Sequence, residues 1–150
     1  MFSLTNYETV RILIRIGEKM TDKTVTPRPT DAELAILNVL WERGPVTVRE
    51  VHEALTTQEH GTGYTTVLKL LQIMTEKGLV VRDESQRAHI YEARYSEQKT
   101  QRQLLTDLME RAFGGSPAKL VMQALSSKKA SAEEVEEIRE MLAKLEGESR

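Results

Sequence analysis

Residues 47–91 read TVREVHEALTTQEHGTGYTTVLKLLQIMTEKGLVVRDESQRAHIY. Thr47 and Glu50 have the spacing of a capping box, and apolar residues follow them at helical intervals, which predicts a short helix. After a polar turn that contains glycine, the apolar spacing predicts a second helix over 64–77. Gly78 ends that helix, because glycine adopts the left-handed conformation of a helix C-cap without strain. Two helices joined in this way form a helix-turn-helix.

A third helix precedes this pair, and a hairpin follows it. Thr30 and Glu33 form another capping box, and Gly44-Pro45 ends the helix that it begins. The β-prone runs 79–82 and 87–91 enclose a polar turn, which predicts a hairpin. Three helices followed by a hairpin make a winged helix-turn-helix. The predicted fold is therefore mainly α, with the hairpin as the wing and a helical C-terminal domain.

The last third of the chain predicts three amphipathic helices, which begin at the capping residues Ser96, Ser116 and Ser131. Helices of this size build little core alone, and small units often need oligomerisation. A homodimer is the first interpretation. The alternative is a helical cap that folds back on the winged helix of the same chain. The predicted dimerisation residues are Leu104, Leu105, Leu108, Leu120, Val121, Leu125, Val135, Ile138 and Leu142.

In a winged helix, the last of the three helices enters the major groove of DNA. Lys69 can contact a phosphate or hydrogen-bond to a guanine, and Gln72 can hydrogen-bond to an adenine. Thr65 and Leu68 can pack on the methyl group of a thymine. Threonine hydroxyls near a helix start favour phosphate, and basic residues of the wing suit the DNA backbone. The predicted DNA-binding residues are Thr62, Tyr64, Thr65, Thr66, Leu68, Lys69, Gln72, Arg82, Arg87 and His89.

The composition of the chain restricts how it can bind DNA and which kinds of site it can contain. The 150 residues carry 21 basic and 23 acidic side chains, a net charge of -2, so DNA binding must come from the placement of charge. The absence of cysteine excludes disulfides, thiolate zinc sites and cysteine nucleophiles, and it allows a cytoplasmic location. No apolar run approaches the ~18–20 residues of a membrane span.

The sequence contains partial matches to enzyme motifs, and each match lacks residues that the motif requires. The two Ser-x-x-Lys matches begin at Ser96 and Ser116, where helix capping is the ordinary role, and the partner motifs of serine β-lactamases are missing. His52-Glu53 begins like a zinc-protease helix, but Thr56 stands where the second histidine is required. The spacing of the three histidines supports no metal site. We therefore predict no enzymatic activity, no metal and no cofactor.

The expected organisation is a flexible leader over 1–29, a winged-helix DNA-binding domain over 30–95 and a helical dimerisation domain over 96–150. Residues 20–29 of the leader are polar and contain Pro27 and Pro29, which is typical of a flexible segment. Its first 19 residues are either a short amphipathic element or an upstream mis-start, because Met20 is a second plausible start.

Four runs cover most of the chain beyond the leader: TDAELAILNVLWERGPVTVREV, GYTTVLKLLQIMTEKGLVVRD, RAHIYEA and AFGGSPAKLV. They resemble the penicillinase-repressor (BlaI/MecI/CopY) family of bacterial transcriptional regulators. The resemblance implies a winged-helix domain, a C-terminal dimerisation domain and a homodimer bound to a palindromic double-stranded operator. It also implies repression of antibiotic-resistance or metal-handling genes. In the best-known members, a membrane sensor metalloprotease cuts the repressor.

This chain departs from two branches of that family. The copper-responsive branch uses a cysteine cluster near the C-terminus, which is absent here. In the protease-regulated branch, cleavage falls before an apolar residue of the first C-terminal helix. The corresponding stretch is 105–113, and it contains no Asn–Phe bond. The competing interpretation is a winged-helix module of the transcription machinery that contacts protein, which an exposed apolar patch on 64–77 would favour.

Overall fold

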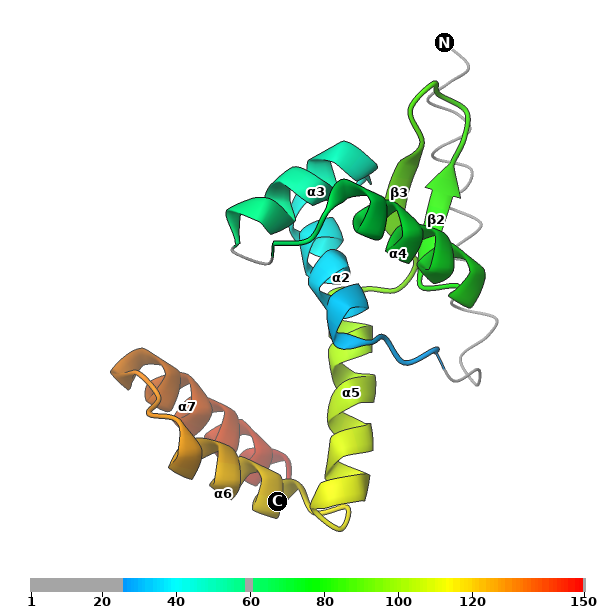
Figure 1. Cartoon of the computed structure of the whole chain (residues 1–150). Coiled ribbons are helices and arrows are strands. Elements are labelled where there is room, and N and C mark those ends of the chain that lie inside the picture. The colour runs from blue at the N-terminus through cyan, green and yellow to red at the C-terminus, as the bar shows by residue number, and fades with distance from the viewer. Residues whose placement is uncertain (1–25, 59–60, 150) are drawn as a thin grey trace. The chain divides into compact units, whose positions relative to one another are not determined.

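The computed structural model describes residues 26–58 and 61–149 of the chain (Figure 1). They form two compact units, one that ends at Leu104 and one that begins at Leu105. Residues 1–25 lie outside the described residues, and with them the predicted choice between a start at Met1 and one at Met20. His60, which the sequence analysis weighed as a metal ligand, also lies outside them.

Helix α2, Asp31–Arg43, begins at the predicted capping box. The Glu33 amide donates to Thr30 Oγ1 at 3.3 Å, and the Thr30 amide donates to the Glu33 carboxylate at 2.9 Å. Glu33 is buried, with 3% of its surface exposed. Its carboxylate also accepts a hydrogen bond of 2.7 Å from the Lys77 ammonium at the end of the third helix. This ion pair joins two helices that are far apart in the sequence.

The helix-turn-helix consists of α3, Val48–Thr57, and α4, Tyr64–Lys77. The predicted capping box starts α3, where the Glu50 amide donates to Thr47 Oγ1 at 3.3 Å. Helix α4 ends at Gly78, whose φ of 80° is left-handed and whose amide donates to the Thr75 carbonyl at 3.2 Å. The start of α3 and the end of α4 therefore have the local causes that the sequence predicts.

The wing is part of a three-stranded antiparallel sheet, β1-β3-β2, made of β1 Val46–Thr47, β2 Val80–Asp83 and β3 Ile90–Ala93. Strand β1 is not predicted from the sequence, and the last strand begins at Ile90 and not at residue 87, where the sequence predicts its start. The pairing ends at Asp83 opposite Ile90. The Ser85 amide then donates to Asp83 Oδ1 at 2.8 Å, which turns the chain. Residues 84–89 are consequently the loop at the tip of the wing.

One apolar core holds the first unit together. The side chains of Ile36, Val51, Val67, Leu71 and Met74 have no exposed surface, so all three helices contribute to it. Tyr91 of β3 is also buried and attaches the sheet to this core. The predicted winged helix-turn-helix is confirmed.

The segment immediately before α2 is attached to this unit. Residues 26–29 belong to the predicted flexible leader, and they form neither helix nor strand. The Thr26 carbonyl accepts a hydrogen bond from Gln103 Nε2, and the Arg28 carbonyl accepts one of 3.4 Å from Lys77 Nζ. The described end of the leader therefore contacts the winged-helix unit.

The C-terminal helices are α5 Glu97–Ala112, α6 Pro117–Ser127 and α7 Ala132–Glu148. Helix α5 crosses the boundary between the two units. Ser96, Ser116 and Ser131 are caps, because their hydroxyls accept from the amides of Lys99, Lys119 and Glu134 at 3.1, 3.2 and 3.1 Å. None of the described helices has the length and apolar character needed to cross a membrane.

Candidate nucleic-acid interface

Helix α4 presents a polar stripe to solvent. Thr65, Lys69, Gln72 and Glu76 are exposed and follow one another at intervals of three or four residues. That spacing places them on one face, because side chains three and four positions apart are neighbours on a helix. The opposite face carries the buried residues Val67, Leu71 and Met74. Core packing therefore holds the polar stripe outward, and we call these four residues the α4 stripe.

The structure corrects the placement of Leu68. The sequence analysis assigned it to the outer face, but its side chain is half-buried and packs against the core. The reason is helical geometry: Leu68 precedes buried Leu71 by three positions, so the two side chains are neighbours. Leu68 therefore adds no fully exposed apolar side chain beside the α4 stripe.

The start of α4 can accept an anion. Gly63 at the N-cap has no side chain that could occupy the first-turn amides, and the first turn of α4 carries no acidic residue. Of the two threonines predicted here, Thr66 is exposed and Thr62 is half-buried. Tyr64 is 48% exposed. Free amides at a helix start favour a phosphate through their partial positive charge.

The three predicted wing residues differ in their surroundings. Arg87 and His89 are exposed in the loop at the tip of the wing. Arg82 lies in β2, where its guanidinium forms an ion pair with Glu84. A hydrogen bond with Tyr91 is the main cause that raises the pKa of Arg82, and the Glu84 charge adds to it. Arg82 thus already has partners within the wing, whereas no ion pair is described for Arg87.

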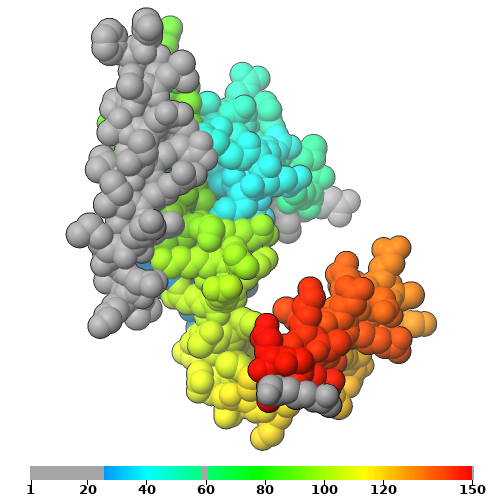
Figure 2. All heavy atoms as spheres, turned by 180° about the vertical axis from the view of Figure 1, so that it is seen from behind, coloured from blue at the N-terminus to red at the C-terminus, as the bar shows by residue number. Residues whose placement is uncertain are grey.

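The predicted dimerisation residues are incompletely covered in the single chain. Neither α6 nor α7 contains a buried residue. Figures 1 and 2 show these two helices in orange and red, toward the C-terminal end of the chain. The exposed members of the predicted set are Leu105, Leu108, Val121, Leu125 and Leu142, and its half-buried members are Leu104, Leu120, Val135 and Ile138.

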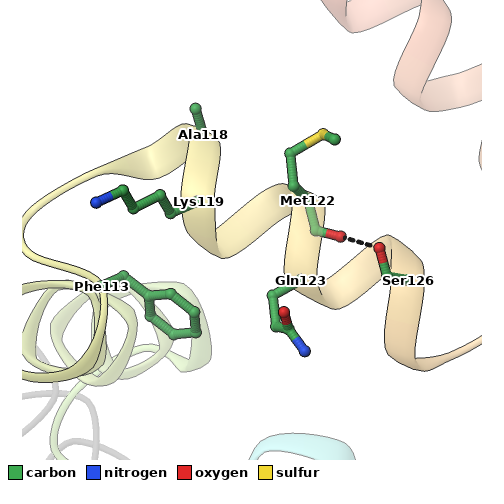
Figure 3. A pocket seen from close by; sticks show the side chains of 6 residues that line it. All are labelled: Phe113, Ala118, Lys119, Met122, Gln123 and Ser126. Atoms are coloured by element: carbon green, nitrogen blue, oxygen red, sulfur yellow. Dashed lines mark hydrogen bonds between the residues drawn. The ribbon is translucent and has the colours of Figure 1, made fainter.

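An open hollow adjoins α6. Figure 3 shows the six residues that line it, namely Phe113, Ala118, Lys119, Met122, Gln123 and Ser126. Its volume is about 500 Å³. Phe113 comes from the turn after α5, and the other five residues come from α6. Three further large apolar side chains of the C-terminal unit are exposed outside the predicted set: Met122, Met141 and Leu145.

Sequence reasoning missed one feature of the α4 region. The ring of His52 in α3 lies edge-on to the ring of Tyr64, with centroids 5.8 Å apart and an interplanar angle of 79°. From the sequence, His52 stands out only as part of an incomplete metalloprotease motif and as one of three histidines whose spacing supports no metal site. Helical spacing could not reveal the pair, because a turn separates the two helices. Among the described residues, no group of three or more His, Asp or Glu side chains could hold a metal.

Three packed helices, an exposed polar stripe on the last of them and an antiparallel wing define the winged helix-turn-helix class of DNA-binding proteins. Within this class, the chain belongs to the penicillinase repressor family, whose profile matches residues 29–144. This family is one of transcriptional repressors. Separately, Ser96 and Ser116, which begin the two Ser-x-x-Lys matches, act as helix caps. The predicted family membership is confirmed.

This chain is also similar to individual proteins. "Transcriptional regulator BlaI" of Mycobacterium tuberculosis strain CDC 1551 is 35% identical over 119 residues, which cover 77% of this chain and 83% of the relative. A solved structure of Bacillus licheniformis BlaI, a monomer in complex with the blaP half-operator, is 23% identical. It covers 49% of this chain and 89% of that chain, with a TM-score of 0.43. A MarR family protein of Bacillus stearothermophilus is 21% identical and covers 97% of this chain and 90% of that chain, with a TM-score of 0.44.

Proposed function

We propose that this protein is a dimeric repressor that binds a palindromic operator in the bacterial cytoplasm. Residues 30–95 would bind DNA and residues 96–150 would form the dimer. The observation that carries the proposal is the α4 stripe, which offers a hydroxyl, an amine, an amide and a carboxylate on one exposed helix face. Side chains of these types hydrogen-bond to base edges in the major groove.

The same stripe argues against the alternative of a protein-binding module. Such a module would present apolar side chains on the exposed face of α4, and Leu68 was the main candidate. Leu68 packs against the core, and all four residues of the α4 stripe are polar. DNA is the partner that this surface fits better.

The homodimer is supported by the uncovered apolar side chains of the C-terminal helices. Large exposed apolar surfaces usually mark interaction sites, and neither α6 nor α7 buries any residue in the single chain. A two-fold symmetric dimer presents two copies of α4. For that reason its operator has two inverted half-sites.

Release from DNA by a membrane sensor metalloprotease completes the proposal, and its support is family membership. In the corresponding stretch, 105–113, only Phe113 lies outside α5. Gly114 and Gly115 follow it in a turn. Exposed turns are cut more readily than helices. The end of α5 is therefore the place where cleavage needs the least unfolding.

Gln72→Ala is expected to relax sequence discrimination. Gln72 lies about two turns along the α4 stripe from Thr65, so both side chains can enter one groove. Loss of the amide should cost about 1–3 kcal/mol on the correct operator and little on other DNA. Gel-shift titrations with the region upstream of the gene and with single-base variants of it measure this. Gln101→Ala, on exposed α5, is the matched control, and unchanged discrimination would place Gln72 outside the interface.

Arg87→Ala is expected to weaken binding to all sequences alike. Its guanidinium is exposed at the tip of the wing, where it can contact a phosphate. Removing one such contact should lower the slope of log affinity against log salt concentration by about one unit. Arg139→Ala removes the same charge from α7 and should leave the slope unchanged. Equal slopes for wild type and Arg87→Ala would contradict a phosphate contact by the wing.

A further inference from the structure

The His52–Tyr64 pair links the two helices of the helix-turn-helix at the point where α4 begins. The rings meet edge to face, the arrangement that aromatic pairs prefer. His52 is half-buried in α3, and its backbone carbonyl accepts a hydrogen bond of 2.8 Å from Thr56 Oγ1. The histidine thus stands on a well-formed helix. Contact with its ring limits the conformations open to the Tyr64 side chain.

Tyr64 keeps about half of its surface exposed despite this contact, with 48% accessible. It precedes Thr65, so on a helix its side chain lies about 100° around the axis from the α4 stripe. The ring contact with His52 places that side chain on the α3 flank of the stripe. When the stripe faces the floor of the major groove, a side chain on its flank faces the groove wall. That wall consists of sugar and phosphate.

We propose that His52 is a positioning residue for operator binding: its ring holds Tyr64 so that the phenolic hydroxyl donates a hydrogen bond to a backbone phosphate in each half-site. The inference rests on the proposed function and deepens it. The first-turn amides of α4, which receive no hydrogen bond from an N-cap side chain, lie beside the same position and favour the same anion. Tyr64 is then a backbone contact that carries no sequence information.

Tyr64→Phe tests the hydroxyl, because it removes the donor and keeps the ring that contacts His52. One lost hydrogen bond to a charged phosphate should weaken binding about tenfold per half-site, and about a hundredfold for a dimer. The loss should be equal on the upstream duplex and on a shuffled duplex of the same length. The salt slope should not change, since a hydroxyl is uncharged and releases no counterion. A loss confined to the upstream duplex would show a base contact and overturn the proposal.

His52 variants test the positioning role. His52→Ala should reproduce the loss seen for Tyr64→Phe, and the double variant should lose no more than either single one. His52→Phe restores an aromatic partner and should bind within about twofold of wild type. Full affinity in His52→Ala, additive losses in the double variant, or failure of His52→Phe to restore binding would each overturn the proposal.

Two measurements separate this inference from its alternatives. Fluorescence of Trp41, the single tryptophan, follows unfolding, and His52→Phe and wild type should unfold at similar temperatures. The Gln72→Ala and Arg87→Ala titrations test the proposed function independently. If those two variants behave as expected while the His52 variants bind like wild type, the positioning role fails and the repressor function stands.

Discussion

Replacing Leu142 with aspartate is expected to convert the protein into a monomer and to lower its operator affinity by about 10²–10⁴-fold. Leu142 is 54% exposed on α7, and the proposed dimer would cover it. A carboxylate there would be buried without a partner, which strongly opposes association. The large effect on DNA arises because a dimer binds its second half-site at high effective concentration, an advantage that a monomer lacks. Sedimentation velocity and operator titration measure the two effects.

Ala143→Asp is the matched control for this experiment. Ala143 is also exposed on α7, but it lies within one turn of Arg139 and Glu140 and away from the apolar side. This variant adds the same charge to the same helix and should remain dimeric with full operator affinity. A Leu142→Asp protein that stays dimeric would place the interface elsewhere. Dissociation of both variants would point to a general loss of α7.

Lys77→Met is expected to destabilise the winged-helix unit by about 2 kcal/mol at pH 7. It removes the ammonium that pairs with the buried Glu33 carboxylate at 2.7 Å. Breaking a buried pair costs about 3–5 kcal/mol when the remaining charge is isolated. The cost should be smaller here, because the Thr30 amide still donates to Glu33 and the Lys77 side chain is 32% exposed. Urea unfolding at fixed protein concentration, followed by Trp41 fluorescence, measures the difference.

The effect should depend on pH with a defined sign. Burial acts to raise the pKa of Glu33, but hydrogen bonds from Lys77 and Thr30 outweigh it, so the pKa lies below the ordinary 4.5. A carboxyl whose pKa is lower when folded stabilises the protein above its unfolded pKa. That contribution is lost as the pH falls through the folded pKa. The difference between wild type and Lys77→Met should therefore be full at pH 7 and shrink below about pH 4.

Two further variants test the ion pair itself. Combining Glu33→Gln with Lys77→Met removes both charges and keeps a capping-box side chain, so most of the lost stability should return. Lys69→Met replaces an exposed lysine of the same helix and should change stability by less than about 0.5 kcal/mol. If the double variant is no more stable than Lys77→Met, the uncompensated Glu33 charge is not the cause of the destabilisation.

The accuracy of the sequence prediction varies along the chain for physical reasons. Helix α4 spans Tyr64–Lys77 as predicted, because glycines flank it and its apolar spacing is regular. The capping residues Thr30, Thr47 and Ser131 act as predicted, since each capping hydrogen bond spans three residues. Strand β1 was missed because two residues are too short to show an alternating pattern. It exists only through its pairing with β3.

The candidate site likewise contains some features that the sequence predicts and others that it does not. Exposure of Lys69 and Gln72 follows from helical periodicity and was predicted. The half-buried state of Leu68 was not, since residues on the edge of an apolar stripe are covered or exposed according to the neighbouring core. Arg82 was predicted as a phosphate contact, and its ion pair with Glu84 depends on how the wing folds. The roles of all these side chains in DNA binding remain predictions.

By itself, the amino-acid sequence determined the helices, their caps, the hairpin and the family, because these depend on interactions among neighbouring residues or on motifs that survive in the linear order. Only the tertiary structure decided which distant side chains meet. Glu33 and Lys77 are 44 positions apart, and His52 and Tyr64 belong to different helices. Contacts of this kind depend on how helices pack and which rotamers fit between them, and no local pattern encodes either.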